Sequence, residues 1–134
     1  MSSIAGIYRK DRSAALHKGE IEAMMDSLHH WDASQRAHLT DGSVGFGQLM
    51  LHNTPESKQE KLPYRDAATG LIITADARID NRKELLRRLD MDRGSDQSVP
   101  DSLLILESYK KYATQCPGYL TGAFAFAIFD PSSG

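Results

Sequence analysis

The sequence has very little cysteine, since Cys116 is the only one among 134 residues. A single thiol excludes an internal disulfide framework and is typical of proteins from a reducing compartment. The first residues also lack the basic start and apolar stretch of a secretory signal peptide. We therefore expect a cytoplasmic protein.

Long hydrophobic runs are absent as well. The longest, Ala123–Phe129, is far shorter than the roughly 20 residues that a helix needs to cross a bilayer. Neither charge sign dominates, because 16 Lys and Arg residues stand against 18 Asp and Glu residues, a formal net charge of −2. The composition predicts one globular domain with neither a membrane nor a nucleic acid as its partner.

Short apolar segments predict four β-strands. The last of them alternates strictly, which places Phe124, Phe126 and Ile128 on one face and alanines on the other. The first begins almost at the N-terminus, where a chain usually frays unless a sheet holds it. The predicted strands are Ser3–Tyr8, Val44–Leu51, Leu71–Thr74 and Ala123–Phe129.

Three segments have the apolar spacing of amphipathic helices. The first covers residues 20–31, with an apolar stripe of Ile21, Met24, Met25 and Leu28. The second runs from Asp80-Asn81 to Leu89, and the third from Pro100 to about Tyr112, with Asp101 as the expected N-cap. Strands and helices do not alternate as in a parallel α/β fold, so the predicted class is antiparallel α+β.

Four sequence blocks, spread over nearly the whole chain, resemble one known family. The start Met1–Tyr8 is similar to the M-C-G-I-A-G-I-Y start of class II glutamine amidotransferases, which include the glutaminase domain of asparagine synthetases. The segments 74–81, 100–106 and 120–130 resemble that family's V-N-G-E-I-Y-N, S-D-x-E-x-I-L and L-x-G-M-F-A-F-A-I-W-D. The segment A-D-A-R-I-D-N-R, residues 75–82, most resembles the corresponding segment of asparagine-synthase-like enzymes that close lasso peptides or β-lactam rings.

The resemblance implies a fold and a domain context. The fold is the four-layer αββα sandwich of N-terminal nucleophile hydrolases, with antiparallel sheets. Residues 1–134 would form a single, partial glutaminase-like domain, truncated at its C-terminal end, because in the family an ATP-binding synthetase domain follows. That domain, in the same polypeptide, would be the partner of this one and would hold ATP and Mg²⁺. No cofactor is expected in residues 1–134, and a peptide substrate or a homodimer stays open as a further partner.

The resemblance also assigns catalytic positions, most of which are replaced here. The family's nucleophile is a cysteine thiolate at the mature N-terminus, and Ser2 stands at that position. The family's Asn-Gly pair supplies the oxyanion hole, and Asp76-Ala77 stands in its place. A carboxylate there would repel a developing oxyanion instead of stabilising it.

The substrate-binding positions are altered too. Met50 aligns with the arginine that holds the substrate carboxylate, and Arg78 replaces a glutamate. Asp101 alone matches, at the position whose carboxylate meets the ammonium group of bound glutamine. We hypothesise that the guanidinium of Arg78 pairs with Asp101 or Asp76 and fills the empty pocket.

These replacements predict a degenerate amidotransferase domain without glutaminase activity. Its intact parent is expected to be an ATP-dependent, asparagine-synthase-like ligase that forms an amide or a ring. The domain would then act as a scaffold or a substrate-docking surface. Two other functions stay open: an active hydrolase that uses Ser2 after removal of Met1, and a stand-alone protein-interaction module.

Three further features are given structural interpretations. The neighbouring His29 and His30 would point in different directions from the end of a helix, so no metal site is predicted. Cys116 has no basic residue beside it and is expected to be structural. The basic run from Arg78 to Arg88 is expected to form a solvated helix face, with docking of a partner as the alternative.

Overall fold

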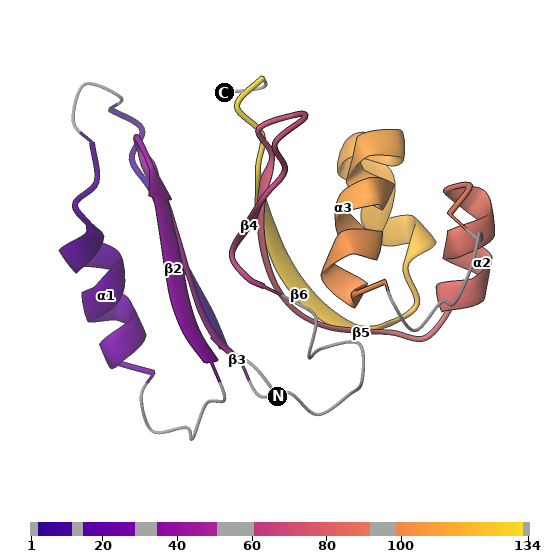
Figure 1. The fold of residues 1–134 in the computed structure, drawn as a ribbon, viewed down its shortest axis with the longest axis horizontal. Helices are drawn as coiled ribbons and strands as arrows, with labels where there is room; N and C mark the ends of the chain where they lie inside the picture. The colour runs from indigo at the N-terminus through magenta and orange to yellow at the C-terminus, as the bar shows by residue number, and fades with distance from the viewer. Residues whose placement is uncertain (1–2, 12–14, 29–34, 51–60, 92–98, 133–134) are drawn as a thin grey trace. The chain divides into compact units, whose positions relative to one another are not determined.

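The computed structural model describes residues 3–11, 15–28, 35–50, 61–91 and 99–132 (Figure 1). The chain forms two compact units. The first unit comprises residues 1–52, 61–76 and 126–134, and the second comprises residues 53–60 and 77–125.

The first unit contains a three-stranded antiparallel sheet in the order β1 (Ser3–Tyr8), β3 (Val44–Met50), β2 (Gln35–Asp41). The predicted N-terminal strand is confirmed, and it pairs with β3 from Ser3 opposite Leu49 to Tyr8 opposite Val44. Strand β2 was not predicted, because its polar sequence carries little strand signal. Its pairing along the whole of β3 supplies the stability that its own side chains do not.

Helix α1 (Lys18–Asp26) packs on one face of this sheet (Figure 1). Ile21 and Met25 are fully buried against Leu49 of β3. The helix approaches so closely that a Cβ on Gly47 would lie 2.6 Å from Cγ of Met25. Glycine is therefore needed at this point of β3 for the helix to reach the sheet.

The predicted helix over 20–31 is displaced and shorter in the structure. It begins at Lys18, and its entry is stabilised by a 3.0 Å hydrogen bond from the backbone N–H of His17 to the Glu20 carboxylate. It ends at Asp26. Met24 does not belong to the buried stripe, since 38% of it is exposed. It lies on the flank of the helix that turns away from the sheet.

The second sheet has the order β4 (Tyr64–Arg65), β5 (Ile72–Ile79), β6 (Gly122–Phe129). Strand β5 continues five residues beyond the predicted Leu71–Thr74, through most of the 74–81 block. Within the first unit, buried Val44 and Phe46 of β3 meet Ile72 of β5 in one apolar cluster. The inner faces of the two sheets thus share a core in this unit.

The second unit holds helices α2 (Arg82–Arg88) and α3 (Asp101–Tyr112) and the 3-10 helix η3 (Ala113–Tyr119). Both predicted α-helices are confirmed, whereas η3 was not predicted. The buried apolar side chains of this unit's described helices are Leu85, Leu86, Leu104, Ile105, Leu106 and Cys116. They form the apolar interior of the unit.

The predicted α+β class with antiparallel sheets is confirmed. The described residues form three α-helices and two small sheets, the elements that an αββα sandwich requires. None of the helices in these residues is long and apolar enough to span a bilayer.

Candidate functional site

The second half of β5 and the first residue of α3 carry four of the six candidate residues. Asp76, Ala77 and Arg78 follow one another along β5. Asp101 opens α3, and its Oδ2 accepts a 3.2 Å hydrogen bond from the backbone N–H of Ile79 at the end of β5. In the second unit, therefore, the Asp101 carboxylate is held directly beside the strand that carries Ala77 and Arg78.

Asp101 is not the N-cap of α3, so that expectation is wrong. Pro100 takes the N-cap position, with extended backbone angles of φ −64° and ψ 153°. A side chain one residue further on cannot fold back over the first turn in the same way. The carboxylate of Asp101 turns instead to the end of β5, where it satisfies the backbone N–H of Ile79.

Arg78 does not fill a pocket, so the predicted pairing with Asp101 or Asp76 is also wrong. Its side chain is 71% exposed, and its Nε lies 3.2 Å from Oδ1 of Asp80. The reason is the alternation of side chains along a strand. Ile79 is buried at 3% exposure, and its neighbour Arg78 consequently projects from the opposite face.

Arg82 makes the contact that was predicted for Arg78. Its Nη1 pairs with Oδ1 of Asp101, and its Nη2 donates a 2.5 Å hydrogen bond to the carbonyl oxygen of Val99. Both side chains of the pair are largely buried, at 15% and 16% exposure. The sequence placed Arg82 in a solvated basic run, and no local pattern distinguishes it from its neighbours, because its partner lies 19 residues away.

The junction between β5 and α2 is fixed by Asn81. Its side-chain amide donates to the carbonyl oxygen of Tyr119 at 2.9 Å, and its Oδ1 accepts from the backbone N–H of Thr121 at 2.9 Å. The backbone N–H of Asp80 donates to the carbonyl oxygen of Thr121 at 2.7 Å. These bonds tie the start of α2, and with it Arg82, to the segment that leads into β6.

In the first unit, Gln48 holds the middle of β5. This side chain is 1% exposed. Its Nε2 donates to the carbonyl oxygen of Ala75 at 2.7 Å, and its Oε1 accepts from the backbone N–H of Ala75 at 3.3 Å and from Oγ1 of Thr74. The amide thus bonds to Ala75 as a neighbouring strand would, directly before Asp76.

Two candidate residues stay outside this geometry. Ser2 lies outside the described residues, and so do His29 and His30. Met50 closes β3, where its backbone pairs with Gln35 of β2. The predicted roles of Ser2 and Met50 therefore stay predictions.

A comparison with protein families decides the family. The model of the glutamine amidotransferase domain matches residues 1–134. The chain belongs to this family. A comparison with curated proteins finds no match. The resemblance seen in the four sequence blocks is confirmed at the level of the amidotransferase domain.

The amidotransferase domain has a structural cysteine, as predicted. Cys116 is 1% exposed in the interior of the second unit, and its burial raises the pKa of the thiol above its usual range. A thiol kept in its neutral form is a poor nucleophile. Among the residues that the structure describes, no three His, Cys, Asp or Glu side chains gather as metal ligands would.

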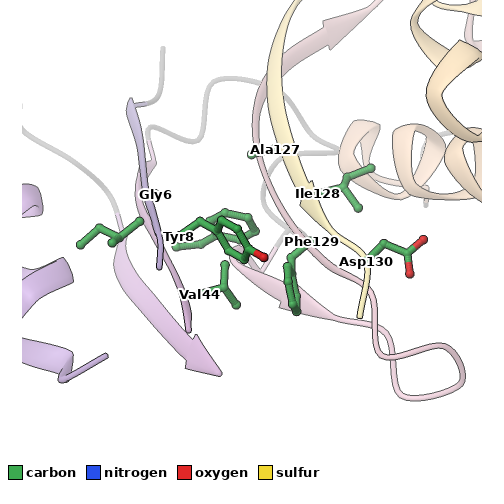
Figure 2. Close-up of a pocket in the computed structure, with 9 residues that line it drawn as sticks. Gly6, Tyr8, Val44, Ala127, Ile128, Phe129 and Asp130 are labelled. Atoms are coloured by element: carbon green, nitrogen blue, oxygen red, sulfur yellow. The ribbon is translucent and has the colours of Figure 1, made fainter. Parts of the chain in front are cut away.

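The first unit of the amidotransferase domain also has an apolar pocket of about 500 Å³ (Figure 2). Tyr8 of β1 and Phe129 of β6 face each other across it, with ring centroids 6.2 Å apart. Asp130 borders it, but its Oδ1 accepts hydrogen bonds from the backbone N–H and the hydroxyl of Ser132. Of the candidate residues that the structure describes, Met50, Asp76, Ala77, Arg78 and Asp101, none lines this pocket.

Proposed function

We propose that this amidotransferase domain does not hydrolyse glutamine. It serves instead as a scaffold or substrate-docking domain of a cytoplasmic, ATP-dependent ligase of the asparagine-synthase type. The residue that carries the proposal is Asp76, at the position where the resemblance expects an amide donor to the oxyanion. A carboxylate at that position would repel the negative charge of a tetrahedral intermediate instead of stabilising it as an amide donor does.

The other replacements support the same proposal. Ser2, at the nucleophile position, offers a hydroxyl, which is much less nucleophilic than a thiolate unless a strong base activates it. Arg78, at the position of the family's glutamate, extends into solvent with Asp80 as its partner. Loss of a single oxyanion donor lowers kcat by about 10²–10³ in other hydrolases. Several losses together predict a rate indistinguishable from the uncatalysed reaction.

A ligase that forms an amide or a ring does not need ammonia from glutamine. In the ring-forming relatives that the A-D-A-R-I-D-N-R block resembles, an amine of the substrate attacks an acyl-adenylate. ATP and Mg²⁺ would belong to a C-terminal synthetase domain in the same polypeptide, and a peptide is the proposed substrate class. The amidotransferase domain would keep its fold because it supports that second domain or its substrate.

The test is ammonia release from glutamine by the chain with Met1 removed, as checked by intact mass. The wild-type protein is expected to release no more ammonia than buffer alone, and so is Ser2→Cys, because Asp76 remains. Ser2→Ala is the matched control. Ammonia release by the wild type that disappears in Ser2→Ala would refute the proposal and establish the N-terminal-serine hydrolase instead.

A further inference from the structure

The ion pair between Arg82 and Asp101 is the most buried one among the described residues. Its two side chains are 15% and 16% exposed, whereas the side chains of the other ion pairs are at least 26% exposed. Asp101 accepts from the backbone N–H of Ile79 with its other oxygen, and Arg82 donates to the carbonyl oxygen of Val99. Two charged groups are thus paired inside the second unit with hydrogen bonds on both sides.

A carboxylate withdrawn from water to this degree requires a cation beside it. The chain provides that cation itself, from the first residue of α2. A ligand with an ammonium or guanidinium group could reach Asp101 only by displacing Arg82. The displaced guanidinium would then lose a charged partner in a region with little water, which makes the exchange unfavourable.

We propose that Arg82 permanently occupies the cation site of Asp101 and so closes this carboxylate to ligands that carry an amine. The inference rests on the proposed function in one respect, namely that Asp101 is the former contact of the substrate ammonium. The closure itself follows from the contacts of Arg82 and Asp101. Arg82 is therefore the residue that decides which ligands this end of the domain excludes.

The position of Arg82 is set by rigid elements. Asn81, directly before it, is bonded to the carbonyl oxygen of Tyr119 and to the backbone N–H of Thr121. Asp101 is held from the other side by the backbone N–H of Ile79. Arg78, the basic residue of β5, does not offer a substitute for this guanidinium, because its side chain projects into solvent beside Asp80.

The experiment is chemical rescue in the full chain. Arg82→Ala should lower Tm by about 10 °C, because one partner of a largely buried ion pair is lost. Methylguanidinium chloride should then raise Tm of Arg82→Ala by about 4 °C at tenfold its dissociation constant, whereas sodium chloride at equal ionic strength should not. Ethylammonium chloride, as the amine probe, should stabilise Arg82→Ala and leave the wild type unchanged.

Two variants serve as controls. Arg78→Ala removes a neighbouring guanidinium that is 71% exposed, and it should change Tm little and show no rescue. In Arg82→Ala/Asp101→Asn the cation site loses its charge, so methylguanidinium should have no effect. Equal stabilisation of the single and the double variant, or none in the single variant, would overturn the proposal.

A measurement on the wild type does not depend on whether Arg82→Ala folds. In ¹⁵N NMR spectra of the arginine side chains, the Nη protons of Arg82 should exchange slowly with water, whereas those of Arg78 should be averaged by exchange. Equal averaging at both residues would contradict the proposal. Ammonia release by the wild type would refute the proposed function but not the closure of Asp101. A failed rescue of Arg82→Ala would refute the closure but not the proposed function.

Discussion

The buried amide of Gln48 is the most informative place to perturb the first unit. Gln48→Met keeps the length of the side chain but removes its amide. Three groups then lose a partner: the N–H and the carbonyl oxygen of Ala75, and the hydroxyl of Thr74. All three lie on residues that are at most 3% exposed, so water cannot replace the lost bonds. At about 1 kcal/mol for each group, the free energy of unfolding should fall by about 3 kcal/mol.

Urea unfolding followed by circular dichroism measures this loss. With a slope of about 2 kcal/mol per molar urea, the midpoint should fall by about 1.5 M. Gln115→Met makes the same chemical change at an exposed position of η3 and should shift the free energy by less than about 0.5 kcal/mol. Thr74→Val combined with Gln48→Met should show a coupling of about 1 kcal/mol. A loss in Gln48→Met no larger than in Gln115→Met would refute the reasoning.

Two other predictions concern the backbone and pH. Gly122→Ala should lower the free energy of unfolding by more than about 3 kcal/mol. Gly122 has a φ of 144°, and a Cβ there would lie 2.0 Å from a β5 carbonyl oxygen. Gly118→Ala is the control in the same urea assay, because a Cβ on Gly118 would meet open space. The backbone N–H of His17 and then the Arg9 side chain lower the pKa of Glu20. Its contribution is therefore present at neutral pH and is lost as pH falls below about 4, so Glu20→Gln should flatten the acid limb of stability against pH. Equal losses of stability in Gly122→Ala and Gly118→Ala would contradict the first expectation. The same loss of stability at acid pH in Glu20→Gln as in the wild type would contradict the second.

The elements that the sequence predicts well are those with an apolar pattern of their own. The alternation in β6 leaves Phe124 and Phe126 half-buried while Ala123 and Ala125 are exposed. The helices α2 and α3 lie close to where their apolar spacing places them. Such patterns are local, because each residue's burial follows from its neighbours in the same strand or helix.

The errors occur where burial depends on a distant partner. Strand β2 forms because β3 pairs with it along its length, and no residue pattern within Gln35–Asp41 predicts that pairing. Met24 has the apolar character of its stripe but lies on the flank of α1. For Arg78 and Arg82 the sequence offers two arginines four residues apart, with no local means of choosing the partner of Asp101.

The sequence by itself determined the fold class and the family resemblance, and it predicts that the family's catalytic residues are replaced, because each of these is a matter of residue identity and order. Only the tertiary structure decided that Arg82, not Arg78, meets Asp101. The physical reason is geometric. Strand alternation turns Arg78 outward, whereas the bonds of Asn81 place the first residue of α2 beside a carboxylate 19 residues further along the chain.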